Sequence, residues 1–194
     1  MKNFFAKYSY TVFKLFLNQF AIALFGVALF SACSRTENKT LVLITGIMSI
    51  LFYLFLQYAV MWEVGAKDGI TAAARNTSRG LWRGVVISLL ANVLNLLLAL
   101  VIAIGAFAVQ GGKLHGIASV CKVISLFLQG MYMGVLSMDV GGTMLKVHVW
   151  PYFAIVLPAV LICTVAYVIG SYGLHFTNIL IPKNKDVKNN GRPE

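Results

Sequence analysis

Apolar residues occur in five runs, each long enough to form a membrane-spanning helix. The runs are Phe13–Ala32, Leu41–Trp62, Gly84–Val109, Ile117–Met138 and Val149–Leu174. The clearest is the second, in which Gln57 is the only strongly polar side chain. At about 1.5 Å per residue this run forms a helix roughly 33 Å long, close to the thickness of a hydrocarbon core. The pattern therefore predicts an integral membrane protein.

The predicted fold is an all-α bundle of about five transmembrane helices, because backbone groups in lipid must bond within their own segment. Residues 1–182 form one multi-pass membrane domain, and residues 183–194 form a short polar tail. The fourth run is the weakest, since it contains Lys122, Gln129, Gly130 and Gly134. The alternative is therefore four spans plus one re-entrant or interfacial helix. The fifth run contains Pro158, which predicts a kink.

The basic residues predict the orientation, because cytoplasmic segments of membrane proteins are enriched in Lys and Arg. Three lysines precede or begin the first run, and four basic residues fill the longest loop, Glu63–Arg83. Both segments are expected in the cytoplasm. Four spans would place eleven of the sixteen basic residues inside, whereas five spans would divide them equally. Charge therefore favours four spans and segment length favours five, which leaves the side of the tail open.

The amino-acid composition helps to distinguish a lipid partner from a nucleic-acid partner. Hydrophobic residues make up 59% of the chain and charged residues 11%, with a net charge of +10. The basic residues lie at segment ends and in short loops, so they fit an anionic lipid surface. A nucleic-acid-binding protein would gather such charge on one face of a soluble fold. We therefore expect the lipid bilayer and its anionic headgroups as partners, and no nucleic acid.

Polar and small residues recur at helical spacing within the apolar runs. In the third run Ser88, Asn92 and Asn95 begin a stripe that continues through alanines. Gln57 shares a face of the second run with Gly46, Ser49 and Tyr53, and Gln129 lies on a similar face of the fourth. Such faces pack helices closely and hydrogen-bond across them. The candidate polar seam, which would pack helices or line a solute path, consists of Ser88, Asn92, Asn95, Gln57 and Gln129.

The longest loop carries the most distinctive hydrophilic pattern. Arg75, Arg79 and Arg83 are four residues apart, which predicts one helical face, and Trp82 lies beside them. Arg with Trp is typical of a membrane interface. We interpret these four residues as a membrane-surface anchor, and the alternative is a docking site for a cytoplasmic subunit or a phosphate-bearing ligand. Glu63 and Lys67 have the spacing of a helical ion pair.

Motifs for catalysis, metal binding and nucleotide binding do not occur in the sequence. Its three histidines and six acidic residues are scattered, and no HExxH, CxxC, GxSxG or GxxxxGK[ST] is present. Cys33 follows small residues as in a lipoprotein cleavage site, but the pattern favours an uncleaved first helix. We expect no cofactor, no metal and no catalysis.

The expected function is therefore that of a small multi-pass protein of the plasma membrane, with a cytoplasmic N-terminus. It would act as a permease subunit or as an accessory subunit of a membrane complex, in contact with other membrane or cytoplasmic subunits. The alternatives are a membrane-embedded enzyme without a known motif and a structural or regulatory bundle.

Overall fold

The computed structural model describes residues 2–36, 38–108 and 112–173, and the predicted polar tail lies outside this part. The expectation of a helical chain is confirmed. The helices are α1 (Lys2–Ser34), α2 (Lys39–Ala74), α3 (Trp82–Ala91), α4 (Val93–Ala106), α5 (Lys113–Leu128), α6 (Met133–Leu136), α7 (Trp150–Ala154) and α8 (Val156–Ser171). Short 3-10 turns, Gly130–Tyr132 and Leu145–Val147, accompany an antiparallel hairpin of β1 (Asp139–Val140) and β2 (Thr143–Met144).

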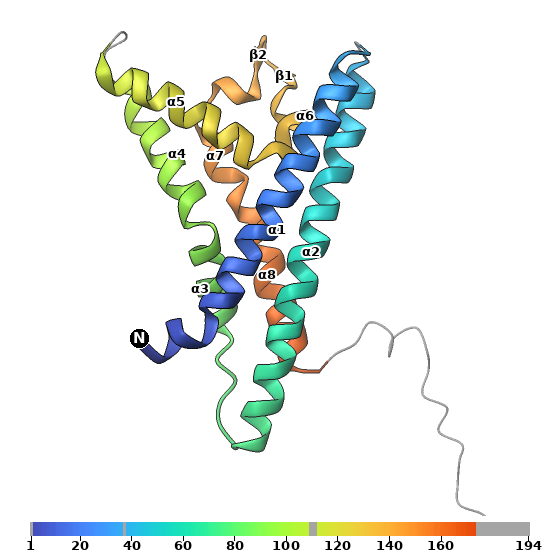
Figure 1. Cartoon of the computed structure of the whole chain (residues 1–194), viewed down its shortest axis with the longest axis vertical. Coiled ribbons are helices and arrows are strands. Elements are labelled where there is room, and N and C mark those ends of the chain that lie inside the picture. Colours follow the sequence, from blue (N-terminus) through green and yellow to red (C-terminus); the bar gives the residue numbers. More distant parts are fainter. Residues whose placement is uncertain (1, 37, 109–111, 174–194) are drawn as a thin grey trace, which may run out of the picture.

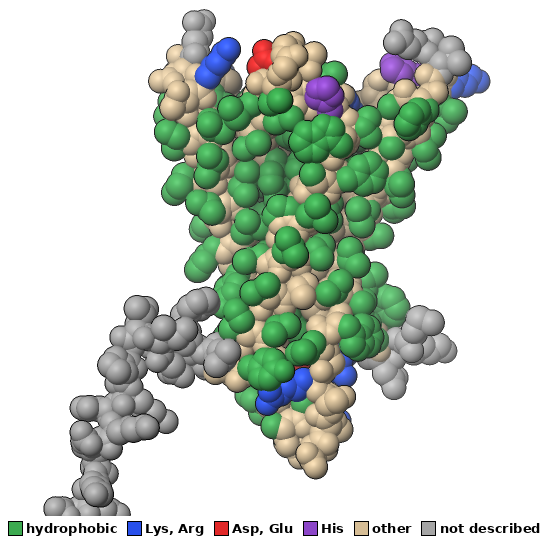
Figure 2. Space-filling view, turned by 180° about the vertical axis from the view of Figure 1, so that it is seen from behind, with side chains coloured by type: hydrophobic (Ala, Val, Ile, Leu, Met, Phe, Trp, Pro, Cys, Tyr) green, Lys and Arg blue, Asp and Glu red, His purple; other side chains and the backbone are tan. Residues whose placement is uncertain are grey.

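Within these residues, three helical stretches are long and apolar enough to cross a membrane: α1, α2 and the α7–α8 pair. Two further pairs, α3 with α4 and α5 with α6, pass the same criterion but are bent at a short break. The described chain thus holds three candidate spans, or up to five if each bent pair counts as one. Figure 2 shows hydrophobic side chains over most of the surface between the two ends. The arrangement is compatible with membrane insertion.

The two ends of the molecule differ in shape (Figure 1). One end, named here the basic end, holds the start of α1, the α2–α3 loop and the last turn of α8. At the other, named the open end, the α1–α2 pair and the α4–α5 pair diverge, and the β-hairpin lies between them. The fourth apolar run both begins and ends toward the open end, because α5 descends from it and α6 turns back.

Helix α2 is longer than its apolar run, and most of the predicted loop Glu63–Arg83 is helical. Lys67 and Glu63 form the predicted ion pair, with 2.6 Å between Nζ and Oε1. The helix ends in a Schellman motif: Asn76 has φ +49°, its N–H donates to Ala73 O, and Thr77 N–H donates to Ala72 O. The alanine-rich sequence before this cap extends the helix, so the connection to α3 is short.

The third and fourth apolar runs are each broken, a feature that the sequence pattern allowed only for the fourth. The axis bends by 60° at Asn92, whose side-chain Nδ2 donates to Ser88 O and so competes with the helical backbone. The axis bends by 83° at Gln129. There Gly130 lies so close to α1 that an added Cβ would be 2.2 Å from Ala23 O. The close approach of α1 requires glycine at this bend.

The fifth run is interrupted at Ile155, between α7 and α8. Pro158 has no N–H to donate to the carbonyl of Ala154, four residues earlier, so the interruption falls one turn before the proline. The predicted disturbance of this run is therefore present, and it lies toward the N-terminal side of Pro158.

Helix α8 packs against α2 at the basic end through backbone contacts. An added Cβ on Gly65 would be 2.2 Å from Tyr167 O, and one on Gly170 would be 2.2 Å from Trp62 O. Around this contact lies a core that includes Leu15, Met61 and other buried apolar side chains. The tightest helix packing near the basic end therefore joins the second helix of the chain to the last.

Candidate functional site

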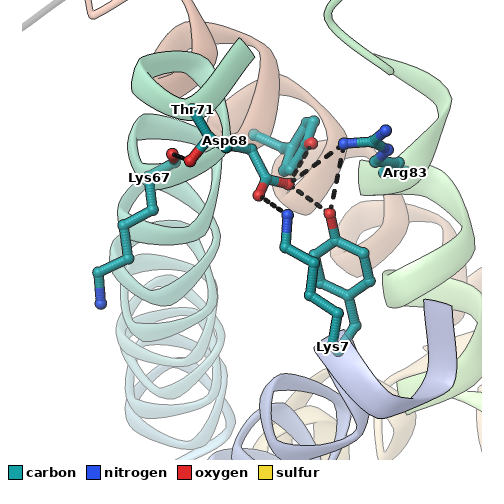
Figure 3. A network of polar contacts seen from close by, with 7 residues as sticks. Lys7, Lys67, Asp68, Thr71 and Arg83 are labelled. Carbon is teal, nitrogen blue, oxygen red and sulfur yellow. Dashed lines mark hydrogen bonds and ion pairs between the residues drawn. The ribbon is translucent and has the colours of Figure 1, made fainter. Parts of the chain in front are cut away.

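A buried carboxylate, Asp68, is the centre of the polar network at the basic end. Its side chain is 7% exposed. Lys7 Nζ donates to Oδ1 at 2.5 Å, while Tyr8 OH and Tyr167 OH donate to Oδ2 at 2.5 and 2.7 Å. Arg83 Nη1 lies 3.9 Å from Oδ2 and 3.5 Å from Tyr8 OH. Figure 3 shows these contacts converging on Asp68 from one side.

Four helices supply the network, although its residues are far apart in the sequence. Lys7 and Tyr8 come from the first turns of α1, Asp68 from the last third of α2, Arg83 from the start of α3, and Tyr167 from the last turns of α8. The N-terminus of α1 is further fixed by Phe4, whose ring stacks on Trp82 with centroids 5.9 Å apart. One carboxylate therefore ties together all the helices that meet at this end.

The network holds two cations and one anion, so one positive charge remains uncompensated within it. Asp68 is buried, but Lys7 is 49% exposed and Arg83 35% exposed, so the cations remain partly hydrated while three donors bond to the anion and Arg83 lies 3.9 Å from it. A buried carboxylate with that many partners is stabilised as an anion, and removal of its partners would leave an uncompensated charge. Since its oxygens are occupied, Asp68 is suited to hold helices together and not to accept a proton from a substrate.

Sequence reasoning treated Asp68 as a loop residue and missed this network. A signal was present, because the polar face of the second run continues beyond its apolar end. The buried positions of α2 are Gly46, Ser49, Tyr53, Gln57, Val60, Met61, Gly65, Asp68, Gly69 and Ala72. Steps of three and four along this series place Asp68 on the same face as Gln57, which marks it as a helical, inward-facing residue.

All five residues of the predicted polar seam are buried, with exposures of 0–4%. Gln57 Nε2 donates to Leu15 O at 3.1 Å, which links α2 to α1. Asn95 Nδ2 donates to Asn92 Oδ1 at 3.1 Å, within the bent third run. The alanine part of that stripe diverges, because Ala99 is buried while Ala106 is exposed. The structure brings the five residues inside the bundle from three separate segments, α2, α3–α4 and the α5–α6 bend.

Gln129 carries an unused hydrogen-bonding capacity at the sharpest bend of the chain. It is 0% exposed, and neither its Nε2 nor its Oε1 has a hydrogen-bond partner within the part of the chain that the structure describes. Asn95 Oδ1 is also buried without a partner. Buried amide groups normally find a protein or water partner, so these atoms leave hydrogen-bonding capacity unused inside the bundle.

The four residues of the predicted surface anchor do not share a helical face, which corrects that expectation. Arg75 caps the end of α2, Arg79 lies in the loop, and Trp82 and Arg83 begin α3. Two of the arginines are engaged within the protein: Arg79 lies over the Tyr172 ring at 4.6 Å, and Arg83 contacts the Asp68 network. The helix cap at Asn76 separates the arginines, because it ends the helix before the second of them.

A groove of about 580 Å³ lies at the open end, between the α1–α2 turn and the β-hairpin. Its lining includes Phe30, Val42 and Met144, with Lys39 and Asp139 as charged members. Within the described ranges, no group of three or more His, Cys, Asp or Glu residues is placed to hold a metal ion. No protein family, curated protein or solved structure that was compared matches the chain.

Proposed function

We propose that the chain is a small multi-pass protein of the plasma membrane that acts without catalysis, as a permease subunit or an accessory subunit of a membrane complex. The observation that carries the proposal is how little of each long helix the chain buries. In the most apolar 18-residue window of each candidate span, 22–33% of the residues are buried. The remaining surface is available to lipid and to other membrane subunits.

The membrane topology that fits this fold has four crossings and one re-entrant segment. Helices α1, α2, the bent α3–α4 pair and the α7–α8 pair cross, while α5 and α6 enter from the open end and return to it (Figure 1). This is the arrangement that places eleven of the sixteen basic residues on one side. The positive-inside rule then directs the basic end, with the N-terminus and the α2–α3 loop, to the cytoplasm.

The divergence of the two helix pairs supports the role of a subunit over that of a self-contained bundle. Large apolar side chains on α4 remain uncovered, including Leu97 at 53%, Leu100 at 50% and Ile104 at 58% exposure. In the bilayer, association of helices is driven by packing, and a flared surface of this kind offers a partner more contact than a closed cylinder does.

A specific observation favours the permease form of the proposal. Gln129 and Asn95 bring unpartnered amide atoms into the bundle interior. Re-entrant segments and broken helices in transporters line solute sites near the middle of the membrane. No carboxylate accompanies these amides on the seam, so the solute that suits them is neutral and polar.

The first test is of topology. In a background without native cysteines, Ser78→Cys in the α2–α3 loop and Val140→Cys in the β-hairpin are compared with a membrane-impermeant maleimide. Val140→Cys is expected to react in intact cells, and Ser78→Cys only after permeabilisation. Labelling of both from the same side would refute the four-crossing topology, and the reverse pattern would refute the orientation.

The second test is of the subunit role. A photo-crosslinker is placed at Leu100 on α4, with a matched placement at the buried Ala99. Native membranes are irradiated, and the purified product is sized and sequenced. A single partner of defined stoichiometry that crosslinks from position 100 and not from position 99 is expected. Crosslinks to lipid alone, with a monomeric particle in a native-size measurement, would contradict the role.

A further inference from the structure

A pocket between α1 and α2 lies next to the Asp68 network, and the network does not account for it. Its volume is about 170 Å³. It is lined by Lys7, Tyr8, Tyr10, Thr11, Lys14, Val60, Glu63, Val64, Lys67 and Asp68. Three lysines and two acidic residues therefore contribute to the lining of one small cavity, at the end of the molecule that the positive-inside rule directs to the cytoplasm.

The two carboxylates of the pocket are already paired. Asp68 accepts from Lys7 at 2.5 Å and Glu63 accepts from Lys67 at 2.6 Å. Lys14 forms no ion pair or hydrogen bond among the described residues, so it gives the pocket a surplus of one positive charge. Each ammonium carries three N–H donors, and the paired lysines therefore keep donors for a further acceptor.

The rest of the pocket is amphiphilic and small. Val60 and Val64 provide apolar walls. Along α1, Tyr10, Phe13 and Leu17 recur at steps of three and four and are 46–74% exposed, which makes an apolar track from the pocket toward the middle of the helix. Pockets that enclose whole small ligands have volumes of about 300–1,000 Å³. This one fits a headgroup whose apolar remainder lies outside it.

We propose that this pocket binds the phosphate group of an anionic membrane phospholipid, with Lys7, Lys14 and Lys67 as donors and the acyl chain along the Tyr10–Leu17 face of α1. The inference rests on the proposed insertion with the basic end in the cytoplasmic leaflet. The sequence pattern predicts the lipid contact at the loop arginines, two of which are engaged within the protein. The proposed contact lies instead in a cavity between two helices. Lys14 is the residue on which the site depends most, because among the described residues its ammonium forms neither a hydrogen bond nor a close ion pair.

The test measures lipid binding to the purified full chain in nanodiscs of phosphatidylcholine doped with phosphatidylglycerol. Lys14→Gln is the variant, and Lys39→Gln is its matched control, since it removes one charge at the open end. Binding of phosphatidylglycerol is followed by native mass spectrometry and by the lipid-dependent shift of the melting temperature. We expect Lys14→Gln to bind about five-fold more weakly, as a contribution of about 1 kcal/mol per basic residue implies, and Lys39→Gln to bind as wild type does.

Three results would overturn the site. Equal weakening in both variants would show that only net charge attracts the lipid. Unchanged binding in Lys14→Gln would remove the pocket from the interaction. Equal stabilisation by inorganic phosphate at the same concentration would show a site for a soluble anion. These outcomes differ from failure of the proposed function, because a wrong orientation appears in the Ser78→Cys and Val140→Cys labelling and leaves binding in nanodiscs unaffected.

Discussion

The basic end and the open end of this bundle are built in opposite ways. At the basic end, four helices meet on the carboxylate of Asp68, and α8 lies against α2 with only glycine between the backbones. At the open end, two helix pairs separate, and a groove of about 580 Å³ lies beside a hairpin of four strand residues. Lys39 and Asp139 in that groove form no ion pair within the described residues.

The difference separates a tightly bonded region from a loosely packed one within the same chain. The basic end fixes the relative positions of α1, α2, α3 and α8 through charge-assisted hydrogen bonds, which are about twice as strong as neutral ones. At the open end, Lys39 and Asp139 are left without an ion pair among the described residues, so fewer polar contacts fix the helices there. Substitutions at each end, compared by their effect on the free energy of unfolding, test this difference directly.

The largest effect is expected from Asp68→Asn. The substitution removes the anion that lies against Lys7 and Arg83, and we expect it to lower the free energy of unfolding by about 3 kcal/mol, the lower end of the range for a broken buried pair. Unfolding in detergent micelles with a chemical denaturant measures it. The control is Glu63→Gln on the same helix, whose exposed pair with Lys67 is worth less than about 1 kcal/mol. Equal losses would mean that the basic end is no more tightly held than the helix surface.

The next effect tests the close contact of α2 with α8. Gly65→Ala places a methyl group against Tyr167 O, and we expect a loss of about 1–3 kcal/mol from overpacking. Gly116→Ala on α5 is the control, because an added Cβ there meets nothing within 4 Å and alanine favours helix by up to about 1 kcal/mol. Melting temperatures of the two variants should therefore move in opposite directions. A gain in both would show that the α2–α8 contact is looser than described.

A smaller effect is expected in the bent third run, which connects the two ends. Asn92→Leu removes the bonds to Ser88 O and to Asn95, and the loss should be about 0.6–2 kcal/mol, the range for side-chain hydrogen bonds of membrane helices. Chemical denaturation in micelles measures it, with the exposed Leu97→Asn as a polarity control. Unchanged stability of Asn92→Leu would show that the bend does not depend on the asparagine side chain.

The smallest effect is expected at the open end. Lys39→Gln removes a charge that has no partner among the described residues, and the unfolding free energy should change by no more than about 0.5 kcal/mol. Thermal unfolding in the same micelles provides the comparison. A loss of unfolding free energy as large as that of Asp68→Asn would show that the two ends are held equally tightly.

Much of the helical architecture was predictable, because uninterrupted apolar runs and the need to satisfy backbone groups in lipid specify it. The residues at which the helices begin and end were less predictable. The stretch Glu63–Ala74 contains charged residues and reads as a loop, but its alanines and the Glu63–Lys67 pair extend the helix. The bend at Asn92 escaped prediction, because it arises from one side-chain hydrogen bond. The bend at Gln129 fits the predicted alternative of a re-entrant fourth segment, although the approach of α1 at Gly130 was not predictable.

The candidate seam was readable from spacing, since Ser88, Asn92 and Asn95 recur on one helical face and all three are buried. The Asp68 network was not readable, because Lys7, Tyr8 and Tyr167 lie 60 to 99 residues from Asp68 and no local pattern joins them to an acid. What sequence alone conveys is which face of a helix is polar. Which partner that face meets depends on tertiary contacts.

The long separations within the Asp68 network also imply an order of assembly during synthesis. Lys7 and Tyr8 emerge first, and Asp68 reaches them as soon as the hairpin of α1 and α2 has formed. Tyr167 arrives about a hundred residues later, with the glycine-mediated contact of α8. In a chain that folds in the order of its synthesis, Lys7 and Tyr8 therefore hold the carboxylate before α8 is made, and Tyr167 of α8 adds the third donor. Helix α8, the last one described, thus completes a hydrogen-bond network that α1 and α2 begin.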